Sequence, residues 1–229
     1  MKAVELEALS PEAHGALRVS PWRGAKPHFV QVVPAEFAAA AATCPLFLVK
    51  NGETGQFYVG AMFGFRAGED LLTDAKGESD ALQPLDLERQ GFYIAGDDIA
   101  IDPAHPRFTQ DSGEPLFEDE GLPANYLRQM QRVLSRLKTG VEETDAFLAA
   151  MLRHKLVEPI DISLRFDDGE TLTLDGLYTI SLDAVQDLDD ATALEFFRQG
   201  YLQLAYCVAG SLRQVPLLAR RRNRRLGEI

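Results

Sequence analysis

The sequence predicts an α+β fold: an antiparallel, strand-rich first half, then a helical hairpin, a second β-hairpin and a long C-terminal helix. Two pairs of alternating or β-branched segments, each joined by a glycine-containing turn, predict the β-hairpins. Apolar residues repeated at a 3.6-residue period predict amphipathic helices in the second half. The 229 residues are 46% hydrophobic and 25% charged, which is ordinary for a globular chain with a sizeable core.

The first half is expected to be mainly strands. Asn51-Gly52 is a favoured hairpin turn, and it lies between two apolar segments. Gly60 and Gly64 in the second of these segments are expected to admit close packing. A short alanine-rich helix is expected over residues 35–43. The segments predicted as strands are 28–33, 46–50, 56–65, 91–95 and 99–101.

The second half is expected to begin with a long loop over residues 102–123, which are dense in proline, glycine and acidic residues. A helix from Asn125 is predicted to end at Gly140, and a second helix beginning near Thr144 would complete a helical hairpin. Alternation over 160–166 and 171–174 predicts the second β-hairpin, which 176–180 extend. The last long helix is predicted from Asp189 or Asp190 onward.

These patterns suggest an N-terminal arm over residues 1–27 and one α+β domain over 28–215, divisible into subdomains 28–102 and 124–215. Residues 216–229 are predicted to be a basic tail, either solvated or paired intramolecularly. The net charge is −12, so the body of the chain is acidic and repels nucleic acid. No nucleic-acid partner is therefore expected.

The sequence also predicts an intracellular protein. Acidic residues interrupt the first positions before an apolar signal region forms, and no apolar run approaches the roughly 20 residues needed to cross a bilayer. The only cysteines, Cys44 and Cys207, are expected to stay reduced and buried. We therefore expect a cytoplasmic protein that does not insert into the membrane.

Several short motifs follow one another in a specific order. They are Phe29-Val30 with Pro34 and Glu36-Phe37, Cys44-Pro45-Leu46-Phe47 before Asn51-Gly52, Leu116 to Gly121, Thr144 to Phe147, Gly169 to Leu177, and Ala209 to Leu212. In this order the chain resembles the proteobacterial SapC family over roughly residues 25–220. It departs from the family at Arg89-Gln90-Gly91-Phe92-Tyr93, where members typically carry two arginines, an aromatic residue, proline and phenylalanine.

The resemblance implies a genomic context for the protein, but no particular reaction. The family, largely uncharacterised, is named for its association with surface-layer genes. Its members often neighbour genes for halogenase-like flavoproteins, cupin-like oxygenases and TonB-dependent receptors. The resemblance thus implies an accessory role in nutrient uptake or in the modification of a small molecule or peptide.

Catalytic motifs are scarce in the sequence. No zinc-type spacing of His or Cys and no nucleophile elbow is present, so neither a metal site nor a cofactor is predicted. The acidic loop offers His105, Arg107 and Asp111 as candidate acid–base or metal-binding groups. The alternative is that this loop is simply solvated.

Aromatic residues of the strand-rich half are candidates for a binding surface. Most are expected in the core, but Trp22, Tyr58 and Tyr93, with Arg89, could line a groove for a sugar or a peptide. Trp22 could instead anchor the N-terminal arm to the body.

The leading hypothesis is a non-enzymatic binding or accessory protein. Its ligand would be a small molecule, a glycan or a peptide, and its partner an enzyme such as a flavin-dependent halogenase-like protein or a cupin-like oxygenase. One alternative is an enzyme that uses the 102–120 loop with His105. Another is a structural homodimer formed through the apolar last helix.

Overall fold

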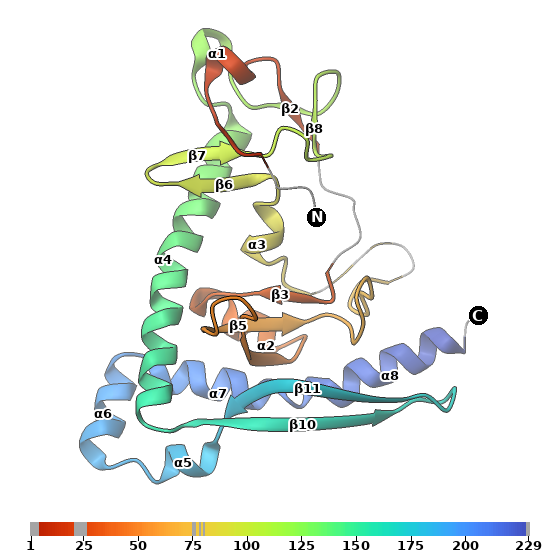
Figure 1. The fold of residues 1–229 in the computed structure, drawn as a ribbon, viewed down its shortest axis with the longest axis vertical. Helices are drawn as coiled ribbons and strands as arrows, with labels where there is room; N and C mark the ends of the chain where they lie inside the picture. The colour runs from red at the N-terminus through yellow and green to blue at the C-terminus, as the bar shows by residue number, and fades with distance from the viewer. Residues whose placement is uncertain (1–4, 21–26, 75–76, 78, 80, 228–229) are drawn as a thin grey trace. The chain divides into compact units, whose positions relative to one another are not determined.

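The computed structural model describes residues 5–20, 27–74, 77, 79 and 81–227, and it confirms the α+β class (Figure 1). The chain divides into two compact units. Unit 1 consists of Met1–Ala25 and Leu85–Thr139, and unit 2 of Lys26–Pro84 and Gly140–Ile229. This division differs from the subdomains expected at 28–102 and 124–215, because each unit draws on two separate stretches of the chain.

Unit 1 contains two small antiparallel sheets of three strands each. In one sheet β7 lies between β1 and β6, and in the other β2 lies between β8 and β9. The N-terminal residues thus supply strands to both sheets rather than forming a separate arm. The elements are β1 (Glu7–Ala8), α1 (Pro11–His14), β2 (Arg18–Val19), α3 (Leu85–Glu88), β6 (Phe92–Ala95), β7 (Asp98–Ile101), β8 (Phe108–Thr109), β9 (Glu114–Pro115), the 3-10 helix η2 (Asp119–Gly121) and the first half of α4 (Asn125–Arg153).

The acidic segment 102–123 was expected to be a long loop, and that prediction was only partly right. β8 and β9 lie within it and pair with β2 in the registers Val19–Phe108 and Val19–Glu114. Each of these strands is two residues long, so neither shows a period in the sequence. Pairing with a strand about 90 residues earlier in the chain orders the segment.

Unit 2 is built on one five-stranded antiparallel sheet in the order β10-β11-β4-β5-β3. Both predicted hairpins are confirmed: β4 pairs with β5 across the turn at Asn51-Gly52, and β10 pairs with β11. The elements are β3 (Phe29–Gln31), the 3-10 helix η1 (Pro34–Glu36), α2 (Phe37–Ala41), β4 (Leu46–Lys50), β5 (Phe57–Met62), the second half of α4, β10 (Val157–Arg165), β11 (Thr171–Ile180), α5 (Leu182–Gln186), α6 (Asp190–Arg198), α7 (Tyr201–Ser211) and α8 (Gln214–Leu226).

Helices α7 and α8 follow one another along the sheet of unit 2 (Figure 1). The C-terminal stretch is helical as predicted, and Gly200, with φ of 76°, separates α6 from α7. Ser211 on α7 accepts a hydrogen bond from the backbone N–H of Leu46 on β4 at 2.8 Å. Val215 and Leu218 of α8 pack with the buried Phe47 and Leu177 of the sheet. Helix and sheet thus share one hydrophobic core.

Helix α4 runs without a break from Asn125 to Arg153, so the predicted helical hairpin was wrong. Gly140 lies inside the helix rather than at its end. A Cβ atom at this position would lie 2.6 Å from Cβ of Val33, so only glycine lets the helix approach the β3–η1 connection. The hydroxyl of Thr144 donates to the Gly140 carbonyl at 2.7 Å, which keeps the buried hydroxyl hydrogen-bonded. Gly140 therefore marks a point of close packing and not the end of a helix.

Replacing Gly140 with alanine should destabilise the protein, although alanine is favoured over glycine in helices by about 1 kcal/mol. The new methyl group overlaps Val33, and overpacking of this kind costs about 1–3 kcal/mol. Chemical denaturation would measure the change. The matched control is Gly210→Ala in α7, where a Cβ meets no atom within 4 Å, so no loss is expected. Equal effects at the two sites would contradict this account.

The basic C-terminal segment forms most of α8, and two of its arginines, Arg222 and Arg225, make polar contacts within the molecule. Arg222 is 6% exposed; its Nη2 donates to Glu170 at 2.7 Å and its guanidinium lies 4.0 Å from the centre of the Phe166 ring. Its Nε lies 3.4 Å from Glu69. Arg225 donates to the carbonyls of Asp70 and Thr73. These contacts hold α8 against the sheet and the 69–74 segment.

Replacing Arg222 with alanine should lower the free energy of unfolding by about 2 kcal/mol, since it removes a buried cation that pairs with two half-buried carboxylates. Arg224, which is exposed on the same helix, supplies the control, and its alanine variant should change stability by less than about 0.5 kcal/mol. Urea denaturation of the two variants would measure the difference in their stability. A freely solvated tail would make both variants neutral.

Candidate functional site

Arg107, a predicted acid–base candidate, is a buried structural residue of unit 1. It is 5% exposed, and its Nη1 donates to the carbonyls of Glu88 at 2.9 Å and Gln90 at 2.6 Å. Its Nη2 donates to the hydroxyl of Tyr126. Burial of the guanidinium lowers the pKa of Arg107. The side chain therefore crosslinks α3, the turn after it and α4, and its hydrogen-bonding groups are largely used in doing so.

Of the other two residues of that set, His105 lies beside Arg107, whereas Asp111 is exposed. His105 is half-buried, and its Nδ1 accepts a hydrogen bond from the backbone N–H of Arg107 at 3.4 Å. Burial, with Arg107 nearby, lowers the pKa of His105, which favours the neutral imidazole. Asp111 is exposed on the segment between β8 and β9. Among the described residues, no group of three or more His, Cys, Asp or Glu side chains could hold a metal ion.

Arg107→Ala should therefore act as a stability mutation and lower the free energy of unfolding by about 2–3 kcal/mol, because it removes the donor of two part-buried carbonyls and a phenol. Tyr126→Phe should cost about 1 kcal/mol. The exposed variant Asp111→Asn is the control and should stay within about 0.5 kcal/mol of the wild type. Thermal and urea denaturation would measure all three. A wild-type-like Arg107→Ala protein would rule out this structural role.

The predicted ligand-binding residues fall into both units. Arg89 and Tyr93 are brought together in unit 1, where the guanidinium lies 5.3 Å from the ring centre and also pairs with Asp86 at 2.6 Å. Tyr58 belongs to β5 in unit 2. Trp22 lies outside the described residues. The structure thus supports Arg89 with Tyr93 as one local pair and Tyr58 as part of a different site.

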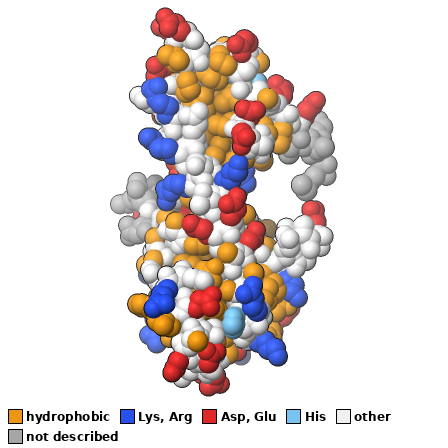
Figure 2. Space-filling model, turned by 90° about the vertical axis from the view of Figure 1, so that its left-hand side faces the viewer, with side chains coloured by type: hydrophobic (Ala, Val, Ile, Leu, Met, Phe, Trp, Pro, Cys, Tyr) orange, Lys and Arg blue, Asp and Glu red, His pale blue; other side chains and the backbone are white. Residues whose placement is uncertain are grey.

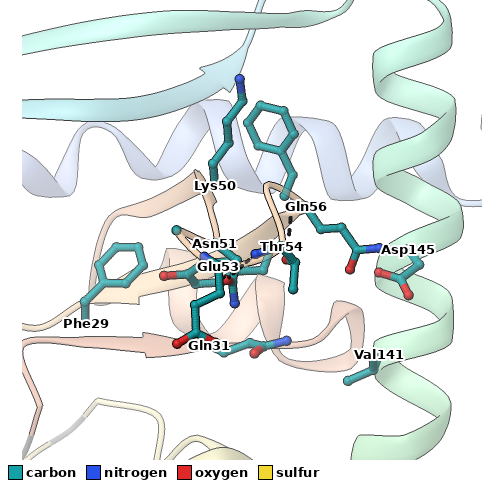
Figure 3. A pocket seen from close by; sticks show the side chains of 12 residues that line it. Phe29, Gln31, Lys50, Asn51, Glu53, Thr54, Gln56, Val141 and Asp145 are labelled. Carbon is teal, nitrogen blue, oxygen red and sulfur yellow. Dashed lines mark hydrogen bonds between the residues drawn. The ribbon is translucent and has the colours of Figure 1, made fainter.

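Tyr58 lines an open cavity of about 690 Å³ in unit 2 (Figure 3). Three segments form its walls: the edge strand β3, the β4–β5 hairpin with its turn, and the part of α4 that begins unit 2. The lining residues are Phe29, Gln31, Lys50, Asn51, Gly52, Glu53, Thr54, Gln56, Phe57, Tyr58, Val141 and Asp145. We call this cavity the hairpin pocket.

The turn at one side of the hairpin pocket is held in place by its own hydrogen bonds. The side-chain Oδ1 of Asn51 accepts from the backbone N–H groups of Glu53 at 2.8 Å and Thr54 at 3.1 Å. The backbone N–H of Gln56 donates to the hydroxyl of Thr54 at 3.3 Å. Gly55 has φ of 70°, which a side chain would strain. The turn therefore presents its polar groups from a defined backbone.

Aromatic rings form the apolar part of the hairpin pocket. The rings of Phe29 and Tyr58 meet edge to face, with centroids 6.2 Å apart. Phe29 lies directly over Gly60, where a Cβ would overlap the ring at 2.0 Å, so the predicted close packing at this glycine is confirmed. Burial raises the pKa of Tyr58, which keeps its phenol protonated over the physiological range.

Lys50 lines the pocket, and its ammonium group lies near two aromatic rings. Its ammonium nitrogen is 5.2 Å from the ring centre of Phe57 and 5.4 Å from that of Tyr178. In Figure 3 its side chain extends away from Gln31 and Glu53. The carboxylates of Glu53 and Asp145 also line the cavity, so positive charge is not concentrated there. The pocket thus combines rings with amides and carboxylates.

The chemistry of such a lining suits neutral, polar ligands. Amide side chains donate and accept hydrogen bonds at once, and rings pack against apolar faces of sugars or peptides. Gln31, Asn51 and Gln56 contribute the amides. The sequence pointed to Tyr58 through its aromatic neighbours. It could not point to Gln31 or Asp145, because these are separated from the hairpin in the chain and reach the pocket only through folding.

A family model for SapC matches residues 9–218 of the chain. The chain belongs to the SapC family. Comparison with curated proteins and with solved structures gave no match. The SapC region therefore covers both units and ends within α8. No helix among the described residues is long and apolar enough to cross a membrane.

Proposed function

We propose that this SapC protein is a non-enzymatic binding or accessory protein of the cytoplasm, and that its hairpin pocket takes a glycan or a short peptide. The observation that supports this is the composition of the pocket: three aromatic rings and three amide side chains around an open cavity of about 690 Å³. Cavities of a few hundred Å³ with apolar walls and a few polar groups are the usual form of ligand sites.

The electrostatics favour a ligand without multiple negative charges. Glu53 and Asp145 would repel phosphate or carboxylate groups, and Lys50 is already engaged with the rings of Phe57 and Tyr178. A sugar ring offers hydroxyls for the amides and an apolar face for an aromatic ring. An extended peptide offers the same pair of features through its backbone and side chains.

The proposal also includes a partner enzyme. We place the protein beside a halogenase-like flavoprotein or a cupin-like oxygenase that modifies the bound molecule, in a pathway linked to nutrient uptake. The support for this is the gene context that the SapC resemblance implies. The alternative of an enzyme centred on His105 has less support, because Arg107 is committed to structural hydrogen bonds and Asp111 is exposed.

Ligand screening by saturation-transfer NMR with neutral oligosaccharides and with short uncharged peptides would test the pocket. Tyr58→Ala should weaken binding of the best probe about tenfold, since loss of one aromatic contact and its buried area is worth roughly 1–1.5 kcal/mol. Gln56→Ala, at an exposed position, should also weaken binding without affecting the fold.

Tyr93→Ala is the matched control, because it removes a half-buried tyrosine of unit 1 and should leave the affinity unchanged. Thermal denaturation of each variant would show that it is folded. Equal losses in the Tyr58 and Tyr93 variants, or no binding by the wild type at millimolar probe, would refute the proposal. Co-purification with the neighbouring flavoprotein or oxygenase tests the partner separately.

A further inference from the structure

The charges of the C-terminal helices are arranged in blocks. Residues 182–198 carry five carboxylates and one arginine, residues 199–212 carry no charged side chain, and residues 213–227 carry six arginines and no carboxylate. These blocks correspond to α5 with α6, to α7, and to α8. We call these consecutive helices of unit 2 the C-terminal ridge; along the chain it is acidic first, uncharged in the middle and basic last.

The inner side of this ridge is fully used by the core of unit 2. Buried positions recur at three- or four-residue spacing along α7 and α8: Ala205, Val208, Ser211, Val215, Leu218 and Arg222. This is the spacing expected for one face of a helix. Packing in the core therefore explains the apolar residues on the inner side of these helices. It does not explain those on the outer side.

Each of these helices also exposes an apolar side chain that the core does not use; we refer to these exposed surfaces as the outer side of the ridge. Phe197 at the end of α6 is 71% exposed, Tyr206 on α7 is 53% exposed and Leu217 on α8 is 42% exposed. Gly210 lies between the last two, with open space where a Cβ would stand. Figure 2, which faces the side where α6 lies, shows exposed apolar side chains beside charged ones in the lower part of the view. A helix as apolar as α7 is normally covered on both sides.

We propose that this outer ridge, from α6 to α8, binds a second copy of the same chain in an antiparallel, two-fold arrangement. Two-fold symmetry places the acidic end of one ridge against the basic end of the other. Tyr206 and Leu217 then lie near the centre. The exposed Arg213, Arg220 and Arg224 continue the same three- and four-residue spacing toward the basic end.

The charge pattern favours a second copy of the chain over other binding partners. An anionic membrane surface would attract α8, but it would repel the carboxylates of α5 and α6. A uniformly acidic or basic partner would be repelled at one end in the same way. A second copy matches both ends at once, because in an isologous interface each contact between two residues occurs twice.

Sedimentation equilibrium of the full chain over 1–100 µM tests the proposal. The wild type should form a dimer, and Phe197→Asp and Tyr206→Asp should shift it to monomer while circular dichroism stays unchanged, since both side chains are exposed. Glu195→Arg alone and Arg220→Glu alone should each weaken the dimer about tenfold. The double variant should recover most of that loss. Arg136→Glu in unit 1 is the matched charge-reversal control and should have no effect.

Three results would overturn the proposal: a wild type that is monomeric at 100 µM, a dimer that both aspartate variants leave intact, or a double charge reversal that restores nothing. Binding of a monomeric wild type to phosphatidylglycerol vesicles would assign the ridge to a membrane surface instead. Ligand binding in the hairpin pocket uses other residues, so its outcome is independent of this one.

Discussion

The contact between Gly140 and Val33 is the constraint on which much of the architecture depends. The chain passes between the two units three times, and the crossing at Thr139–Gly140 lies within α4. A side chain at position 140 would collide with the residue that links β3 to η1, so α4 could not be both continuous and closely packed there. Val141 and Asp145, which line the hairpin pocket, follow directly from that packing. A residue without a side chain thus permits both the close packing of α4 and the position of one wall of the candidate site.

Local signals in the sequence were enough to predict the hairpins. The Asn51-Gly52 turn and the alternation in β10 and β11 act over a few residues, and nothing elsewhere in the chain opposes them. Gly140 misled the prediction because glycine ends many helices, and only the distant Val33 reveals why it occurs inside one. β8 and β9 escaped prediction because two-residue strands have no period of their own and depend on β2.

The candidate site was predictable to a smaller degree. The aromatic character of β5 suggested Tyr58, yet Gln31 and Asp145, which also line the pocket, lie far from the hairpin in the sequence. The reverse holds for Arg107. Its position in an acidic loop suggested catalysis, whereas its burial among carbonyls and the rings of Phe92 and Tyr126 makes it structural. Charge in the sequence does not reveal whether a side chain faces solvent. The surroundings of Tyr58 and Arg107 in the folded chain decided the role assigned to each.

The interleaved make-up of the units has a consequence for synthesis on the ribosome. Unit 1 has all its segments once residue 139 has emerged, whereas β3, β4 and β5 of unit 2 emerge earlier and must wait for β11. Until then β4 presents an unpaired edge of apolar residues, a form of strand that readily pairs with other chains. The nascent chain therefore passes through an interval in which molecular chaperones, or slow translation after residue 139, would influence the yield of folded protein.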